Sequence, residues 1–224
     1  VKFLLYSIAG ALMGLFGVIY LTLHTTANTF VPGGSLEPAL LQSPSGLFLA
    51  VLFICMIGFG TKAGLFPMHG WLPTAHPIAP TPASAVLSGA VVKAGALCIL
   101  RVLYFVVGPG AFRGTWPQTA LLSLALTTAL IGSAQALRQK HIKRRLAYST
   151  VSQMSYILFG LFMANGLALQ GALLHTVFHA VMKTCLFLCA GAIIGTGGTA
   201  DVDQMRGLGK RMPVTLWGFT LAGV

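Results

Sequence analysis

Three ionisable side chains share one face of a long apolar segment. His175, His179 and Lys183 are spaced four residues apart in the run LALQGALLHTVFHAVMKTCLFLCAGAIIG. Four residues is close to one helical turn, so the three side chains should point the same way. The run is long enough to cross a bilayer, where ionisable groups are costly and usually functional. A line of such groups predicts a path for protons or cations.

Two more lysines, Lys62 and Lys93, lie inside other apolar runs. Burial disfavours the charged form of lysine and histidine because the charge loses its hydration. A buried base can therefore bind or release a proton when a nearby charge changes, and bases linked by water would form a proton path. The carboxylates are Glu37, Asp201 and Asp203, all outside the apolar runs. Any carboxylate partner inside the membrane must come from elsewhere.

The same residues could suggest a metal, because an HxxxH pair on a helix can bind zinc. The cation of Lys183 would oppose zinc, and the apolar runs supply no Asp or Glu ligand, so we predict no metal site. The four cysteines lie in apolar runs without CxxC spacing, which favours packing roles. The chain also lacks a glycine-rich phosphate loop. We therefore expect no cofactor and no catalytic redox site in it.

Composition places the chain in a membrane. Of 224 residues, 56% are hydrophobic and 8% are charged, whereas soluble domains carry about 25% charged residues. The expected fold is an all-α, multi-pass transmembrane domain over residues 1–224. The chain begins with Val1 and ends within an apolar run, which indicates a piece of a longer polypeptide. The predicted spans are at about 3–23, 47–66, 83–107, 116–137, 147–164 and 168–195, with a partial span from 214.

In a soluble protein, the net charge of +11 would suggest binding to nucleic acid. In a membrane protein, the positive charge instead indicates which loops face the cytoplasm. Basic residues gather in two loops, after the fourth and sixth spans. They are Arg138, Lys140, Lys143, Arg144 and Arg145, then Arg206, Lys210 and Arg211. The positive-inside rule makes both loops cytoplasmic. The loops at 24–46, 108–115 and 165–167, which hold only Arg113 as a fixed positive charge, then face outward.

The second span contains helix-breaking residues around Lys62. Gly60, Gly64 and Pro67 lower helix stability there. An unwound point within a span is tolerated only inside protein or beside a water-filled cavity, and broken helices recur at ion sites. We predict that Lys62 stands at a break and faces the interior. The alternative is a lysine at a helix end that extends to the cytoplasmic interface.

The proline-rich stretch 67–82 predicts a stiff cytoplasmic connector, with Trp71 at the membrane interface. His69 and His76 in this connector could relay protons at a cytoplasmic entrance, or they could be ordinary polar loop residues. Lys93 lies about a dozen residues into the third span and therefore near the middle of the bilayer. Small neighbours on its face leave room for water or a partner helix.

Three segments, in this order, carry a specific resemblance to a known family. They are TKAGLFPMHGWLPTAHPIAPTPASAVLSGAVVKAG, HIKRRLAYSTVSQMSYILFGL and LLHTVFHAVMKTCLFLCAGAII. The chain resembles the proton-conducting antiporter-like membrane subunits of respiratory complex I, Mrp-type Na+/H+ antiporters and membrane-bound hydrogenases. The resemblance implies a fold of about fourteen helices with inverted repeats, of which this chain is a fragment.

The resemblance also assigns roles. Lys62 corresponds to the family's lysine beside the broken seventh helix, and Lys93 corresponds to the basic residue of the eighth helix. Lys183, together with His175 and His179, corresponds to the basic group of the eleventh helix. The fifth-helix glutamate that pairs with the seventh-helix lysine lies outside this chain, as does the ionisable group expected on the twelfth helix. His141 stands where many relatives have Asp.

The implied function is translocation of protons, or of monovalent cations against protons. The chain would act as a subunit of a complex I-like NADH:quinone oxidoreductase, a hydrogenase or an Mrp-type antiporter, in a bacterial or archaeal membrane. Its implied partners are other membrane subunits, which would carry any redox chemistry, together with H+ or Na+ and lipid. Two alternatives stay open: a non-conducting structural or assembly subunit, and a secondary solute transporter.

Overall fold

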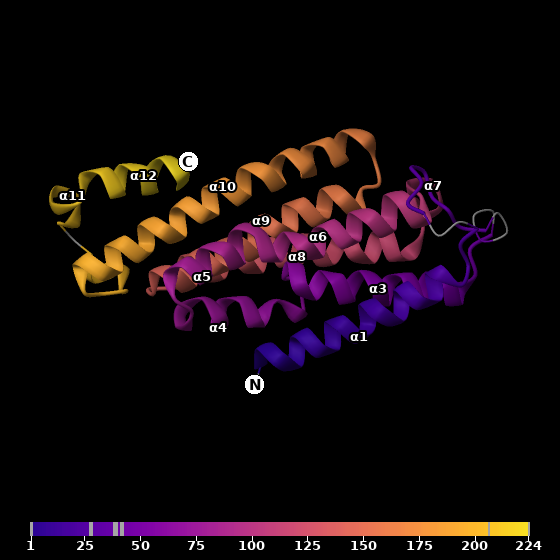
Figure 1. The fold of residues 1–224 in the computed structure, drawn as a ribbon, viewed down its shortest axis with the longest axis horizontal. Helices are drawn as coiled ribbons and strands as arrows, with labels where there is room; N and C mark the ends of the chain where they lie inside the picture. Colours follow the sequence, from indigo (N-terminus) through magenta and orange to yellow (C-terminus); the bar gives the residue numbers. More distant parts are fainter. Residues whose placement is uncertain (1, 27–28, 38–39, 41–42, 206, 224) are drawn as a thin grey trace.

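Long helices lie side by side along the length of the molecule, and the short helices α7 and α11 lie at opposite ends of it (Figure 1). This computed structural model describes residues 2–26, 29–37, 40, 43–205 and 207–223. The long helices are α1 (Lys2–Thr22), α3 (Gly46–Ala63), α8 (Trp116–Arg138), α9 (Ile142–Phe162) and α10 (Gly166–Gly197). The shorter helices are α4 (Trp71–Ile78), α5 (Thr81–Val86), α6 (Val92–Arg101), α7 (Pro109–Phe112), α11 (Leu208–Arg211) and α12 (Pro213–Gly223).

Five helical segments are long and apolar enough to cross a membrane. They are Phe3–Thr22, Gly46–Ile78, Thr81–Val107, Trp116–Arg138 and Gly166–Gly197. Each coincides with a span expected from the sequence, and α12 occupies the expected partial span. The chain is thus an all-α, multi-pass membrane protein. Arg206, one of the basic loop residues, lies outside the described residues.

The remaining expected span, 147–164, is α9, which is the most polar of the long helices. It carries Ser149, Thr150, Ser152, Gln153 and Ser155 within its apolar frame. α9 packs against α8, α10, α4 and α6, so neighbouring helices cover it on several sides. A helix in that position can carry hydroxyl groups, because neighbouring residues satisfy their hydrogen bonds. Its polarity therefore marks an interior position within the bundle.

Glycines bring α1 and α3 into close contact. Gly10, Gly14 and Gly17 line one face of α1, and a Cβ atom built at Gly58 would lie only 2.8 Å from the Gly10 carbonyl oxygen. The Cys55 thiol donates to the Gly14 carbonyl at 3.8 Å. Small residues allow two membrane helices to approach this closely. The contact fixes the position of α3, which carries Lys62 near its end.

α3 stops within the membrane-length segment, where the sequence predicts a break. Gly64 adopts a left-handed conformation (φ 89°) and caps the helix, a conformation that glycine adopts without strain. After a single 3-10 turn at Met68–Gly70 the chain becomes helical again as α4. The break thus falls between two helical pieces of one segment.

The proline-rich connector predicted at 67–82 is partly helical, and its tryptophan is buried within the protein. Residues Trp71–Ile78 form α4, and Trp71 is 1% exposed. Its indole Nε1 donates to the Thr61 carbonyl at 2.8 Å, near the end of α3. Carbonyls near a helix end need new partners, and the tryptophan folds back to supply one. The hydrogen bond holds α4 against the broken helix.

The segment Thr81–Val107 is a continuous helix with two wider turns. π-helical turns at Leu87–Val91 and Val102–Val107 interrupt the α-helical pattern on either side of α6. The Val92 N–H reaches back to the Leu87 carbonyl, five residues earlier. π-turns shift the local carbonyls out of the regular ladder and are frequent at functional sites. The first of them lies directly before Lys93.

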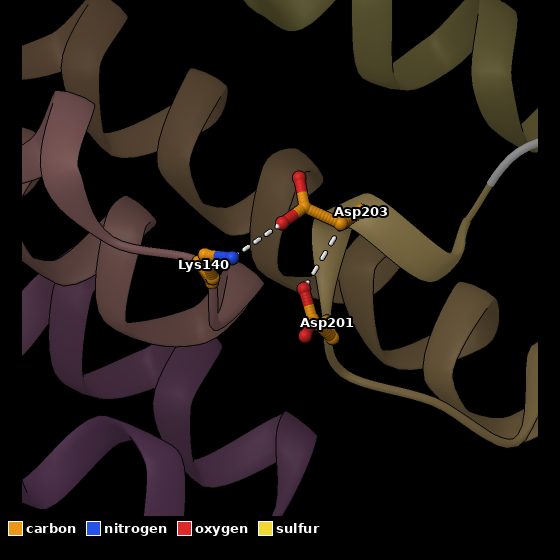
Figure 2. Close-up of polar contacts among 3 residues, drawn as sticks. All are labelled: Lys140, Asp201 and Asp203. Carbon is orange, nitrogen blue, oxygen red and sulfur yellow. Dashed lines mark hydrogen bonds and ion pairs between the residues drawn. The ribbon is translucent and has the colours of Figure 1, made fainter.

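Two loops at one end of the molecule are joined by a short clamp (Figure 2). The Ile142 N–H donates to the Ala200 carbonyl, and the Val202 N–H to the Lys140 carbonyl, both at 2.9 Å. The Lys140 ammonium lies 2.9 Å from an oxygen of Asp203, and this hydrogen bond raises the pKa of Lys140. The clamp connects the α8–α9 turn to the segment after α10.

Candidate functional site

The buried face of α10 carries the basic groups. Lys183 is 2% exposed and His179 is fully buried, while His175, one turn further along, is half-buried. Leu174, Val177 and other apolar residues occupy the exposed face of the same helix. The four-residue spacing thus directs His179 and Lys183 into the protein and directs apolar side chains toward lipid.

A hydroxyl of α9 holds the Lys183 ammonium. Lys183 Nζ donates to Ser149 Oγ at 2.6 Å. A hydrogen bond from a charged donor is stronger than one between neutral groups, which is significant for a lysine with so little exposed surface. The bond crosses from the middle of α10 to the second turn of α9.

Lys93 is held by the segment that precedes α6. Lys93 is 9% exposed, and its ammonium donates to the backbone carbonyl of Ser88, in the π-turn. The Ser88 hydroxyl lies 2.8 Å from the Thr150 hydroxyl. Thr150 donates its own proton to the Leu146 carbonyl at 2.9 Å. Ser88 must therefore donate to Thr150. α9 thus reaches Lys183 directly through Ser149, and Lys93 indirectly through Thr150 and Ser88.

These groups form one electrostatic cluster. Lys93 interacts electrostatically with Lys183, His175 and His179, and His179 also interacts with Lys183. The two imidazole rings are stacked with their centres 5.9 Å apart. In the described ranges, neither ring nitrogen of His179 has a hydrogen-bond partner. The cluster thus combines two lysines with two histidines that can bind water or a proton.

A cleft provides space beside this cluster. It has a volume of about 320 Å³, lies between α6, α9 and α10, and includes Lys93 and Thr176 in its lining. Thr176 is adjacent in sequence to His175. Most other lining residues are alanine, leucine or isoleucine. Glu37, Asp201 and Asp203 are the carboxylates of the chain, and all three lie outside α6, α9 and α10, so the cluster is wholly basic.

The two candidate entrance histidines are placed differently. His76 is fully buried on α4, and its ring stacks on Phe187 with ring centres 4.6 Å apart. Phe187 is one turn beyond Lys183 on α10, and His76 interacts electrostatically with Lys183 and Lys143. His69 is half-buried and stacks on Phe66 at 5.8 Å. The structure therefore brings His76 close to the cluster and leaves His69 beside the break.

Lys62 lies apart from the cluster. Its ammonium is 5.8 Å from the ring centres of both Phe3 and Trp71, on the side of α1. A cleft of about 240 Å³ between α1 and α3 reaches it. Gly95 of α6 packs against the Lys62 Cβ, where an added Cβ would lie 3.1 Å away. The side chain thus starts beside α6 and extends away from Lys93 into an aromatic pair.

The hydroxyls Ser149 and Thr150 were missed by reasoning from the sequence, and Ser88 was considered only as a small neighbour of Lys93. The signal for the first two was present, because YSTVSQMS in α9 is unusually polar for a membrane helix. A hydroxyl at membrane depth needs a partner, so a cluster of them marks a buried surface. The sequence could not say that Ser149 would bind Lys183 while Thr150 binds the residue whose carbonyl holds Lys93.

The fold is that of a polytopic membrane protein with a broken helix and basic groups buried among its helices. Comparison with known proteins identifies the family. The family described as NADH:quinone oxidoreductase/Mrp antiporter, TM, matches residues 1–224, and the chain belongs to it. This confirms the resemblance drawn from the three sequence segments.

Individual relatives come from several kinds of complex. The chain is 38% identical to NADH-quinone oxidoreductase subunit N of Desulforudis audaxviator over 100% of its own length and 44% of that protein. It is 41% identical to hydrogenase-4 component B of Escherichia coli, over 81% of the chain and 29% of that protein. The chain therefore spans less than half the length of these relatives.

Solved structures agree with the fold. In the Mrp complex from Dietzia sp., one chain matches with a TM-score of 0.84 and 25% identity, over 99% of this chain and 40% of that one. An archaeal membrane-bound sulfane sulfur reductase matches with a TM-score of 0.76 and 30% identity, over 96% of this chain and 44% of that one. The chain thus has the architecture of a fragment of an antiporter-like membrane subunit.

Proposed function

We propose that this chain forms part of a subunit that moves protons, or exchanges monovalent cations for protons, across the membrane. One observation carries the proposal: Lys93, Lys183, His175 and His179 form a single basic cluster inside the bundle. Burying like charges without a carboxylate is unfavourable. A helix packed only for stability would gain from apolar residues at these positions, so the cluster favours transport over a scaffold role.

In this mechanism the two lysines carry a mobile proton. Mutual repulsion between the Lys93 and Lys183 ammonium groups favours a state in which only one of them is charged. A charge arriving next to the cluster would shift the proton from one lysine to the other, and water held by His175 and His179 would bridge them. Lys62, which lies apart from the cluster at the broken helix, would be a separate proton-binding group on the α1 side. His69 and His76 remain candidates for the entrance.

The relatives suggest where the subunit operates. They include a subunit of an NADH-quinone oxidoreductase, a hydrogenase component and a chain of an Mrp complex. We infer that this chain likewise works beside other membrane subunits in a bacterial or archaeal membrane. If the complex is an oxidoreductase, partner subunits carry the electron chemistry. H+ is the ion that the cluster suits best, because lysine and histidine bind protons rather than Na+.

The test uses the complete subunit within its complex, in sealed vesicles, with a pH-sensitive dye to follow proton movement. Lys183→Ala and Lys93→Ala should each reduce proton translocation by at least about tenfold, since each removes a switchable charge. Lys210→Ala, which alters an exposed lysine of α11, is the matched control. Assembly is checked by the yield of the intact complex. Normal translocation by both cluster variants would favour a structural subunit.

A further inference from the structure

A large cleft extends along α9 from the clamp. It has a volume of about 830 Å³ and is lined by residues of α8, α9, α10, α11 and α12. Ile142 and Val202, both in the clamp, line it at this end, and Tyr156 lines it farther along α9. Ile142 and Tyr156 are separated by about 21 Å of helix at ~1.5 Å per residue. The cleft thus reaches well into the membrane-spanning part.

One wall of this cleft is polar. Arg145, Ser149, Gln153 and Tyr156 recur along one face of α9 and line it. The Ser152 hydroxyl, which pairs with Ser133 at 2.8 Å, extends the same wall. The facing wall is apolar and includes residues of α10, α11 and α12, among them Ile193, Leu208, Leu216 and Phe219. Polar groups at this depth require hydrogen-bond partners, and a cleft of this size with such a wall suits water.

The polar wall leads to a buried lysine. Ser149 lines the cleft and also accepts the hydrogen bond from Lys183 Nζ at 2.6 Å. Lys183 is 2% exposed and is not itself part of the lining. A single hydroxyl therefore separates the ammonium from the cleft. On the α4 side, the fully buried His76 ring packs on Phe187.

We propose that Lys183 exchanges protons with the side of the basic loops through this cleft, and that Ser149 is the hydroxyl that passes them. In the outward step, the Lys183 ammonium gives a proton to the Ser149 oxygen while Ser149 releases its own hydroxyl proton to a water molecule in the cleft. The products are a neutral amine, an intact hydroxyl and a hydronium ion. Rotation of the hydroxyl restores the starting arrangement. This inference rests on the proposed function and names its access route.

Thiol labelling tests the route independently of transport. The subunit in its complex would first have its native cysteines replaced, with Cys55→Ala, Cys98→Ala, Cys185→Ala and Cys189→Ala. Ser149→Cys and Gln153→Cys are then treated with a membrane-impermeant methanethiosulfonate reagent from the basic-loop side. Thr150→Cys and Ser155→Cys are matched controls, because these α9 residues are buried and do not line the cleft.

The expected result is modification of Ser149→Cys on the order of tenfold faster than Thr150→Cys, because the thiol must be reached by water to react. Arg145→Cys, one helical turn closer to the clamp than Ser149, shows whether the reagent reaches the cleft. If Arg145→Cys reacts and Ser149→Cys is no faster than the buried controls, the cleft is closed before Lys183 and the route is overturned. Reaction only from the opposite side of the membrane would overturn it equally.

A second experiment tests whether proton translocation needs the Ser149 hydroxyl. Ser149→Ala should lower proton translocation several-fold and change its dependence on pH, whereas Ser149→Thr, which keeps a hydroxyl, should retain both. Ser123→Ala, on the exposed face of α8, is the control. If Lys183→Ala stops translocation and Ser149→Ala leaves rate and pH profile unchanged, this proposal fails and the proposed function stands. If Ser149→Cys is accessible and Lys183→Ala translocates normally, the proposed function fails instead.

Discussion

The Ser88 hydroxyl donates to the Thr150 hydroxyl across 2.8 Å, and this bond joins the π-turn before Lys93 to the helix that also holds Lys183. The neighbouring residue, Ser149, accepts the bond from Lys183. Of two successive residues of α9, Ser149 therefore binds Lys183 directly, and Thr150 binds Ser88, whose carbonyl holds Lys93. α9 sets the spacing of the basic cluster, and its polar sequence follows from that role.

Removing one member of the hydroxyl pair should be more harmful than removing both. Thr150→Val keeps the shape and leaves the buried Ser88 hydroxyl without its partner, at a cost of about 1–3 kcal/mol. The melting temperature of the purified complex should fall, and adding Ser88→Ala should recover most of the loss. Thr127→Val, on an exposed part of α8, is the control. A double variant less stable than Thr150→Val would show that the pair does not act as a unit.

The histidines and Lys183 should differ in importance. Lys183→Ala should reduce coupled translocation more than His175→Ala or His179→Ala, because water can replace one imidazole in a chain but cannot replace a switchable charge. The initial rate of the dye response in vesicles, measured for each variant, ranks the losses of translocation. His179, fully buried, should show a larger loss than half-buried His175. A histidine variant more damaging than Lys183→Ala would make imidazole the main proton carrier.

Lys62 should not tolerate a permanent charge if it releases a proton. Arginine stays protonated in proteins, so Lys62→Arg should impair translocation almost as strongly as Lys62→Ala. The aromatic pair of Phe3 and Trp71 can hold either cation, so assembly should be preserved in the arginine variant. Near-normal translocation by Lys62→Arg would assign Lys62 a fixed electrostatic role or a position at the membrane interface.

The basic loops predict the orientation of the chain in the membrane. Residues 138–146 and 201–213 should lie on the cytoplasmic side, and 24–46 on the outer side. Single cysteines at Arg138 and Arg113, introduced into the complete subunit, can be labelled on intact cells with an impermeant reagent. Only the cysteine at position 113 should react before the cells are opened. Labelling of the cysteine at position 138 from outside would reverse the orientation and the direction of the proposed access cleft.

The class of fold, the helix positions and the break at Gly64 could be predicted from local sequence. Length, hydropathy and helix-breaking residues are properties of single segments. The helical nature of 71–78 was missed, because its stability comes from Trp71 binding the Thr61 carbonyl of another helix. That interaction depends on tertiary contact, which prolines in a sequence do not reveal.

For the candidate site, four-residue spacing was sufficient to place His179 and Lys183 on the interior face of α10. It was not sufficient to identify their partners. The Ser149 and Thr150 contacts require knowledge of which helices pack together, and Lys93 required the π-turn that exposes the Ser88 carbonyl to it. Periodicity gives the direction of a side chain, whereas partners across helices come only from the assembled bundle.

The clamp should make stability depend on pH through His141. Partial burial lowers the pKa of His141, and the nearby cations of Arg144 and Lys143 lower it further. The folded state therefore favours the neutral ring, while the unfolded chain binds a proton at the ordinary pKa of 6.5. The resulting stabilisation is present above that pKa and is lost as the pH falls below it.

His141→Gln removes this contribution. The melting temperature of the complex should then fall less between about pH 7.5 and about pH 5.5 than in the parent protein. Other histidines contribute to both proteins, so the comparison isolates His141. An identical pH dependence in the variant would show that the ring titrates alike in both states.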